Sequence, residues 1–357
     1  MPHKAKAKFG TALARRTWQR RWFRLTVWST LVTVVVLATF CLAVITWFKQ
    51  RHSSEPWVYG VSFSKPYAES LDLDWRDTYQ SLLTDLGFRH FRLMSYWDQH
   101  EPVLDQYDFA DLDYQFNEAA KYGAKISLAI GLRQPRWPEC REPSWAQALA
   151  GERWRSELTE YLATVLRRYR NHPALASWQL ENEFGNQDFG RHCRDFDRTR
   201  LTAEAALVKQ LDPNHPLIMN LSNQAGLPIT NPQPDIYGFS AYQRVYEARF
   251  LKRYIDHPSP AWWHSFRAGL IEWLKQKPVI IHELQAEPWS TRPITETPFT
   301  EQLKTLSPEQ LEANLRYAQA TGIRTVYLWG GEWWYWRMVA HRDPSYWQII
   351  EAAINQP

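Results

Sequence analysis

The chain has 357 residues, enough for one large domain or two ordinary ones, and its 20 Trp, 17 Tyr and 16 Phe exceed the needs of a hydrophobic core. Part of this aromatic surface is expected to line a groove. The net charge of +4 is uneven: residues 1–56 hold ten Lys and Arg and one acid, leaving 32 basic against 37 acidic residues, a charge of −5, afterwards. This acidic body argues against a nucleic-acid partner.

Residues 28–48 (WSTLVTVVVLATFCLAVITWF) are 21 consecutive residues without a charge, which is the length of a helix that crosses a bilayer. Eight basic residues precede this run, and only Lys49 and Arg51 follow it closely, so the positive-inside rule places the amino terminus in the cytoplasm. A cleaved signal peptide is the alternative, but its apolar run is usually about 7–15 residues and no small-residue cleavage site follows here.

The expected organisation is therefore a single-pass signal anchor in the cytoplasmic (inner) membrane. Residues 1–27 form a basic cytoplasmic tail, 28–48 the membrane span, 49–56 a linker, and 57–357 a periplasmic or extracellular domain. Cys41 lies in the span, whereas Cys140 and Cys193 lie outside, where disulfides persist. These two form a candidate disulfide, although spacing alone does not decide between a bond and two free thiols.

Beyond residue 56, short apolar runs alternate with amphipathic segments. The apolar runs predict strands at 57–63, 90–95, 125–131, 174–180, 216–221, 236–241, 278–282 and 324–329. The amphipathic segments predict helices at 73–87, 112–122, 146–170, 196–211, 260–275, 307–321 and 344–354, with no convincing helix between the fifth and sixth strands. This alternation favours an α/β fold of the (β/α)8 TIM-barrel type over an open, doubly wound sheet.

The sequence predicts neither a cofactor nor a metal. No GxGxxG or Walker-type loop follows the first strand, which argues against a nucleotide. No CxxC or HExxH pattern is present, so a metal site has no support. The chemistry is therefore expected to rest on side chains alone.

Two carboxylates follow predicted strands at the end where barrel enzymes carry their active sites. Glu183 comes just after 174–180, and Glu283 comes directly after 278–282. Such a pair suits hydrolysis of a glycosidic bond: one carboxylic acid protonates the leaving oxygen while the other carboxylate attacks or positions water. Glu181 and Glu287 are neighbouring acids, and strand alternation does not separate Glu181 from Glu183.

Several motifs resemble those of the clan A glycoside hydrolases. WQLENEF resembles the fourth-strand motif, which implies an acid/base at Glu183 and a substrate contact at Asn182. VIIHELQAEPW resembles the seventh-strand segment, which implies that Glu283 is the nucleophile. YLWGG resembles the eighth strand, whose Trp, here Trp329, floors the cleavage subsite, and residues 96–131 are similar to the corresponding region of families 5, 39 and 42.

The same resemblance extends to further substrate-binding residues. Arg92 matches the second-strand arginine of family 5, and Tyr242 matches a sixth-strand tyrosine that holds the nucleophile, although Ser240 stands where the clan often has a His. We add Trp137 and Trp333 as aromatic contacts to the substrate. The alternatives are a structural salt bridge for Arg92 and core packing for Tyr242 and Trp329.

The sequence thus predicts a membrane-anchored, retaining glycosidase that acts on a β-linked oligo- or polysaccharide. Glu183 is its acid/base and Glu283 its nucleophile, as the resemblance implies. Two alternatives remain open at this point. One is a catalytically silent carbohydrate-binding protein on the same scaffold, and the other is an inverting hydrolase.

Overall fold

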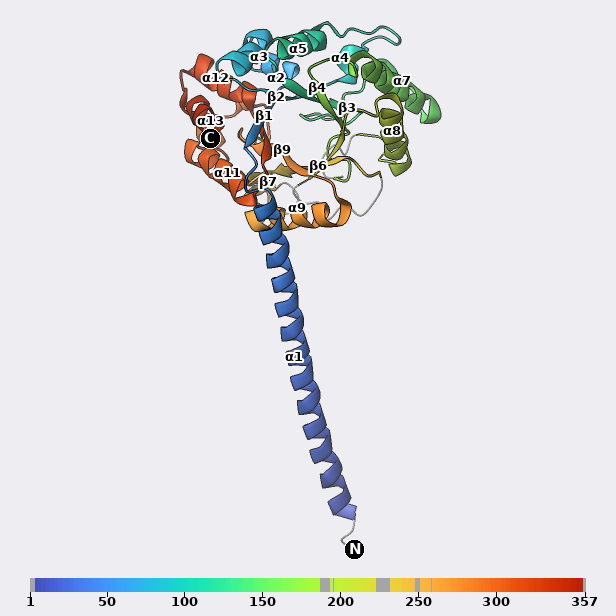
Figure 1. Cartoon of the computed structure of the whole chain (residues 1–357), viewed down its shortest axis with the longest axis vertical. Coiled ribbons are helices and arrows are strands. Elements are labelled where there is room, and N and C mark those ends of the chain that lie inside the picture. The colour runs from blue at the N-terminus through green and yellow to red at the C-terminus, as the bar shows by residue number, and fades with distance from the viewer. Residues whose placement is uncertain are drawn as a thin grey trace.

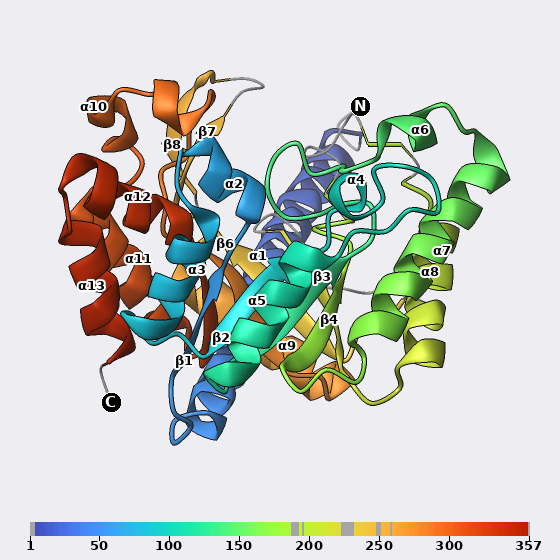
Figure 2. The same cartoon turned by 90° about the horizontal axis from the view of Figure 1, so that it is seen from above.

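The structure, a computed structural model, describes residues 4–186, 193–194, 196–222, 232–247, 251–257 and 259–355. Figure 1 shows a ring of helices around a set of strands, with one long helix projecting from the ring. In Figure 2 the strands and most of the surrounding helices are seen lengthwise. The two views together show that the strand axis runs across the long helix rather than along it.

Eight parallel strands form a closed barrel, which confirms the predicted TIM-barrel fold. Seven of the neighbouring pairs follow chain order, and the last strand pairs back with the first. In order around the barrel the strands are β1 (Val58–Ser62), β2 (His90–Met94), β3 (Lys125–Ile130), β4 (Leu175–Leu180), β5 (Leu217–Leu221), β6 (Ile236–Ala241), β9 (Val279–Gln285) and β10 (Thr325–Trp329). Their apolar composition fits a parallel sheet that is covered on both faces.

The seven predicted helices are present, with ends within a few residues of the prediction. The predicted helix at 146–170 is divided at residues 148–150 into α6 and α7. The outer elements are α2 (Lys65–Ser70), α3 (Trp75–Thr84), α4 (Trp97–His100), α5 (Ala110–Lys121), α6 (Ser144–Gln147), α7 (Gly151–Tyr169), α8 (Arg198–Leu211), α9 (Ala261–Lys275), η1 (Ile294–Glu296), α10 (Phe299–Gln302), α11 (Pro308–Thr321), α12 (Gly331–His341) and α13 (Ser345–Ile354).

Besides several short helices, a hairpin and a longer helix of this outer layer were not predicted. After β6 the chain forms an antiparallel hairpin, β7 (Arg244–Glu247) with β8 (Arg253–Asp256), before α9 begins. After β10 it turns at Gly330, whose φ of 138° suits glycine, and enters α12 at once. No helix was predicted at 331–341, and Trp333 was expected to contact the substrate, so α12 changes the expected position of that side chain.

A register shift separates β6 from β9 at the barrel mouth. Phe239 pairs with Ile281, but Ser240 pairs with Glu283, so His282 is the extra residue. In a regular strand, His282 and Glu283 would face opposite sides of the sheet. Here His282 contacts Ser127 and Asn220 inside the barrel, and Glu283 contacts Arg92, which is also buried there. Bulges of this kind re-aim a side chain next to a site.

The long helix α1 (Lys4–Arg51) contains the predicted span. Its part from Trp22 to Arg51 is long and apolar enough to cross a membrane, and little of its most apolar stretch is buried in the protein. The helix continues to Arg51, within the segment 49–56 that was expected to be a linker, and the turn that follows contacts the barrel. His52 bonds Glu272 (Nε2–Oε2 2.8 Å), and Arg324 donates to the His52 carbonyl (2.9 Å).

Candidate active site

The carboxyl ends of five barrel strands place their polar side chains at one mouth. Glu183 follows β4, Glu283 lies on β9 and Arg92 on β2. Ser240 and Tyr242 come from the end of β6, and Trp329 ends β10. All are buried or nearly so, and the contacts described below link them into one site. The structure therefore brings together groups that lie up to 237 residues apart in the chain, from Arg92 to Trp329.

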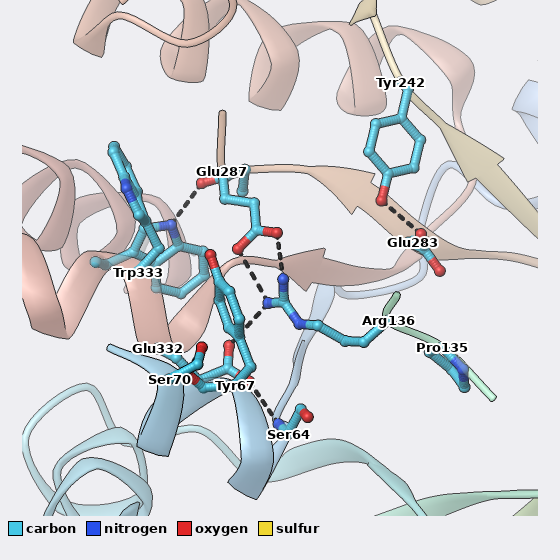
Figure 3. Close-up of polar contacts among 12 residues, drawn as sticks. Ser64, Tyr67, Ser70, Pro135, Arg136, Tyr242, Glu283, Glu287, Glu332 and Trp333 are labelled. Carbon is cyan, nitrogen blue, oxygen red and sulfur yellow. Dashed lines mark hydrogen bonds and ion pairs between the residues drawn. The ribbon is translucent and has the colours of Figure 1, made fainter. Parts of the chain in front are cut away.

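Glu283 is held by two donors. The Arg92 guanidinium donates from Nη1 to Oε2 at 2.6 Å, and the Tyr242 hydroxyl donates to Oε1 at 2.5 Å. Figure 3 shows the Tyr242 ring directed at Glu283. Hydrogen bonds to a charged partner are short and about twice as strong as neutral ones. Each oxygen of this carboxylate thus has a fixed direction at the mouth of the barrel.

Arg92 organises the floor of the site. Besides Glu283, it donates from Nε to Gln179 Oε1 (2.7 Å) and from Nη2 to Asn182 Oδ1 (2.9 Å). Gln179 donates in turn to the same oxygen of Asn182 at 3.2 Å. Arg92 is fully buried, so its fork fixes Asn182 and Glu283 relative to each other. Arg92 therefore forms a buried ion pair, the alternative considered for it above, and its partner in that pair is the site residue Glu283.

Glu183 is held differently, by neutral partners. Ser240 donates to Oε1, and Asn186 Nδ2 lies 3.3 Å from Oε2. The residue adopts a left-handed backbone (φ 46°), a conformation that costs a non-glycine residue free energy and clusters at functional sites. Arg133 braces this turn by donating to the Glu183 carbonyl at 3.0 Å.

Burial raises the pKa of Glu183 to about 7, and the negative charge of Glu283 adds to the effect. The hydrogen bonds from Ser240 and Asn186 oppose this shift but do not cancel it. Below pH 7 the side chain is therefore mostly a carboxylic acid, whereas Glu283 lies against the Arg92 cation. Two carboxyl groups at one mouth thus have unlike surroundings.

Glu181 has a structural role. Its oxygens accept the backbone N–H groups of Leu132 and Arg133 at 2.8 and 2.9 Å, and Arg200 donates to it at 2.8 Å. It also fills the space beside Gly131, where an added Cβ would lie 2.6 Å from Glu181 Oε1. The carboxylate is saturated with donors and ties the β3 loop to β4. These contacts distinguish Glu181, whose carboxylate is fully engaged by structural donors, from Glu183. Strand alternation alone did not distinguish the two acids.

A second ionic cluster lies beside Glu283. Arg136 bonds both oxygens of Glu287 and donates to Glu332 at 3.1 Å, and Glu332 accepts the Ser64 backbone N–H at 2.5 Å (Figure 3). Burial raises the pKa of Glu332 to about 7 despite the Arg136 cation. This cluster ties the loop after β3 to the β9 and β10 ends, so it supports the wall of the mouth.

The three predicted tryptophans have different outcomes. Trp329 is 6% exposed, packs with Met94 and Tyr96, and lies under the Arg136 guanidinium, whose carbon is 4.2 Å from the ring centre. Trp137 is 77% exposed on the loop after β3, and its substrate contact stays a prediction. Trp333 as a substrate contact is wrong: α12 carries it into the core, where it is 0% exposed and donates to Gln302.

Cys140 and Cys193 are joined by a disulfide with a Cα–Cα distance of 5.5 Å. The bond connects the loop after β3 with the segment that precedes α8. It therefore ties together the two loops that bear Arg136 and Glu183. Cys41 is a free cysteine in α1.

Known proteins resemble the chain in part. A family model described as beta-galactosidase (glycosyl hydrolase family 42) matches residues 72–200. The probable mannan endo-1,4-beta-mannosidase F of Neosartorya fischeri is 28% identical over 141 residues, and beta-galactosidase BgaH of Haloferax lucentense is 26% identical over 134. These partial matches show that the chain is similar to the clan A glycoside hydrolases. The matched region includes the Glu183 motif and the Arg92 strand.

The chain aligns with only part of each relative. The matches cover 37% and 32% of the chain, and 29% and 20% of the two relatives. Among solved structures, a GH5_18 protein from Bifidobacterium longum subsp. infantis covers 76% of the chain and 69% of its own length, at 15% identity and a TM-score of 0.55. At that identity, the structural likeness supports the barrel fold.

Sequence reasoning missed four groups of this candidate site. Ser240 was noted only as a departure from the clan pattern, and Gln179 and Arg136 were assigned no contact with the site. Glu139, held by Arg133 at 2.9 Å, is a third carboxylate whose charge raises the pKa of Glu183. Gln179 gave a usable signal, since a polar residue in a buried strand is uncommon, whereas Glu139 sits in a Pro-rich loop with none.

Proposed function

We propose that the protein is a retaining β-glycoside hydrolase held at a membrane by α1. Glu283 is the nucleophile and Glu183 the acid/base, and Asn182, Arg92, Tyr242 and Trp329 bind or position the sugar at the cleavage point. The names of the relatives, beta-galactosidase and mannan endo-1,4-beta-mannosidase, favour a β-galactoside or β-mannoside as substrate.

In the first step a Glu283 oxygen forms a bond to the anomeric carbon while the bond to the leaving oxygen breaks. Glu183 gives its proton to that oxygen, so the leaving group departs as a neutral alcohol. In the second step water attacks the anomeric carbon, Glu183 takes the water proton, and the glycosyl bond to Glu283 breaks. The enzyme returns to its starting state and the anomeric configuration is retained.

One observation carries this assignment: the two carboxyl groups have opposite partners. Glu283 receives a cation and a phenol hydroxyl, an arrangement that suits an anion that must attack. Glu183 is buried among neutral donors with its pKa raised to about 7, which suits a group that must hold and then release a proton near neutral pH. A catalytically silent binding protein has no need of this difference.

Asn182 supports the same assignment. Its side-chain oxygen is occupied by Arg92 and Gln179, which orients the amide so that its NH₂ group is available to donate to a substrate hydroxyl. A hydrogen bond to the sugar 2-hydroxyl strengthens in the oxocarbenium-like transition state. Asn182 is therefore assigned to that hydroxyl, beside the acid/base.

The proposed membrane attachment rests on the charge distribution and length of α1. The uncharged run 28–48 is preceded by eight basic residues, which favours a cytoplasmic amino terminus and an external barrel. The disulfide between Cys140 and Cys193 fits an oxidising compartment. The barrel is thus assigned to the outer side of the cytoplasmic membrane.

Hydrolysis by the full chain in detergent tests the catalytic arm. Aryl β-galactosides, aryl β-mannosides and β-1,4-mannan are the substrates, and proton NMR at early times reports the anomer of the product. We expect retention of configuration. Inversion would overturn the double displacement, and glycan binding without any hydrolysis would favour the silent binding protein.

Two variants and a control assign the residues. Glu283→Gln is expected to remove hydrolysis, and Glu183→Gln to lower kcat/KM by roughly 10²–10⁴-fold on a poor leaving group. Glu312→Gln, an exposed acid on α11, is expected to keep wild-type activity. Full activity of the Glu283→Gln enzyme would show that the nucleophile lies elsewhere.

A further inference from the structure

Helix α9 carries an unusual set of exposed apolar side chains. In the part of the chain that the structure describes, eight large apolar residues outside α1 are exposed, and three of them lie on this helix. They are Trp262, Trp273 and Leu274, which are 50%, 53% and 62% exposed. The charged side chains Arg267 and Glu272 of the same helix are buried. A surface of this composition is costly in water and indicates a partner.

Trp262 and Trp273 share one side of α9. Trp262, Phe266, Gly269 and Trp273 follow one another at steps of four, three and four, so they lie on one face of the helix. Helix α1 crosses this same face at its middle: an added Cβ on Gly269 would lie 2.8 Å from Val44 Cγ1. Figure 1 shows α9 lying across the side of the barrel from which α1 projects.

The contacts with α1 fix the depth of this face. Phe40 packs edge-on against both Phe266 and Trp273, with ring centres 6.3 and 6.1 Å apart. Phe40 lies eight residues before Phe48, the end of the uncharged run, which is about 12 Å along a helix. If the run spans a bilayer, as the proposed function has it, Phe266 and Trp273 contact a residue within the apolar span.

Polar contacts occur on the other side of the crossing. Glu272 pairs with His52 and lies 3.9 Å from Arg51, both of which follow the apolar run. Aromatic contacts thus join α9 to the part of α1 inside the span, and ionic contacts join it to the part just outside. This order, from aromatic to charged, is the order found at a membrane surface, where Trp side chains gather.

We propose that α9 is an interfacial helix that lies in the headgroup region of the bilayer that α1 crosses. Trp262 and Trp273 enter that region on either side of α1, so the barrel is held by two elements rather than by one flexible tether. The proposal rests on the membrane span assigned above. Because the strand axis runs across α1, the mouth with Glu183 and Glu283 then opens sideways, along the membrane surface. This orientation favours a glycan that lies close to the membrane.

Site-directed spin labelling of the full chain tests this placement. The chain, with Cys41→Ser, is reconstituted into phosphatidylcholine vesicles and labelled at one introduced cysteine, in the variants Trp262→Cys, Trp273→Cys, Leu37→Cys or Val339→Cys. Positions 262, 273 and 339 are exposed in the structure. A thermal melt of each variant checks that the fold is kept, which matters most for Trp273→Cys because it removes the contact with Phe40. Collisions with oxygen report lipid, and collisions with a water-soluble nickel chelate report water.

We expect labels at 262 and 273 to collide several-fold less often with the nickel chelate than the label at 339. Position 339 lies on α12, which Figure 1 shows away from α9. The label at 37 is expected to be the most shielded. Shielding at 37 with full water exposure at 262 and 273 would overturn the interfacial helix and leave the span intact. Water exposure at all four positions would overturn the span as well.

Discussion

Ser240 donates a hydrogen bond to the carboxyl group of Glu183 and is also the register partner of Glu283 across β6 and β9. One residue therefore contacts the proposed acid/base and pairs with the proposed nucleophile across two neighbouring strands. Its hydrogen bond favours the charged form of Glu183 and so lowers the pKa that burial and Glu283 raise. The balance of these effects sets the pH range in which the acid can work.

Replacing Ser240 by Ala should move that range upward. The wild-type kcat/KM is expected to fall on the alkaline side with an apparent pKa of about 7, because Glu183 must be protonated to act as the acid. Ser240→Ala removes a donor to the carboxylate of Glu183. The alkaline fall in kcat/KM should therefore shift to higher pH, by up to roughly one unit. Ser95→Ala, a buried serine that bonds the Ala129 carbonyl, is the matched control and should leave the alkaline fall in place. A downward shift would contradict the assignment.

The raised pKa of Glu183 should also cost stability as pH rises. The folded protein holds this proton to about pH 7, whereas an unfolded Glu releases it near 4.5, so the folded state binds more protons between these values and loses stability across them. A shift of this size corresponds to about 3 kcal/mol. Thermal melts of wild type and Glu183→Gln from pH 4.5 to 8 should show the variant gaining relative stability with pH. Glu332 has a similarly raised pKa, but it is present in both proteins and cancels in the comparison.

Tyr242→Phe tests the second donor to Glu283. The phenol hydroxyl fixes the carboxylate oxygen Oε1 at 2.5 Å, and loss of a hydrogen bond to a charged group costs about 1.5–3 kcal/mol. We expect kcat/KM to fall by roughly 10- to 100-fold, with retention of configuration unchanged. Tyr237→Phe removes a hydroxyl from the same strand that bonds Gln233 instead, and it should keep wild-type activity. Equal losses in both variants would point to strand packing rather than to the nucleophile.

Sequence patterns predicted the barrel because every barrel strand is a short apolar run with a helix or a turn on each side. They also singled out Glu183 and Glu283 as candidates, since each comes just after a predicted strand; their catalytic roles stay a prediction. The helix after β10 was missed for a physical reason: Gly330 and Gly331 suggest a loop, and Trp333, Trp334 and Trp336 leave no polar face to reveal a helical period. The incorrect assignment of Trp333 to the groove followed from that.

The contacts that tune the site depend on geometry that no local pattern records. Ser240 donates to Glu183, and a register shift between β6 and β9 places Glu283 opposite Ser240. A one-residue shift in pairing leaves no mark in the sequence. Arg136 lies in a loop, with a φ of 82°, and contacts Glu287, 151 residues further along the chain. Burial of the whole mouth then sets the protonation of Glu183, which is a property of the assembled barrel.

The buried cluster of Arg136, Glu287 and Glu332 makes the strongest stability prediction. Arg136→Met leaves two buried carboxylates without their cation, and removal of one partner of a buried ion pair typically costs about 3–5 kcal/mol. The loss should be larger at pH 8 than at pH 5.5, because protonation of Glu332 relieves its burial, and thermal denaturation at the two pH values measures the difference. Arg316→Met, which breaks an exposed pair with Glu312 on α11, should change stability by less than about 1 kcal/mol. If the two variants melted alike at pH 8, the cluster would not be supporting the wall of the mouth.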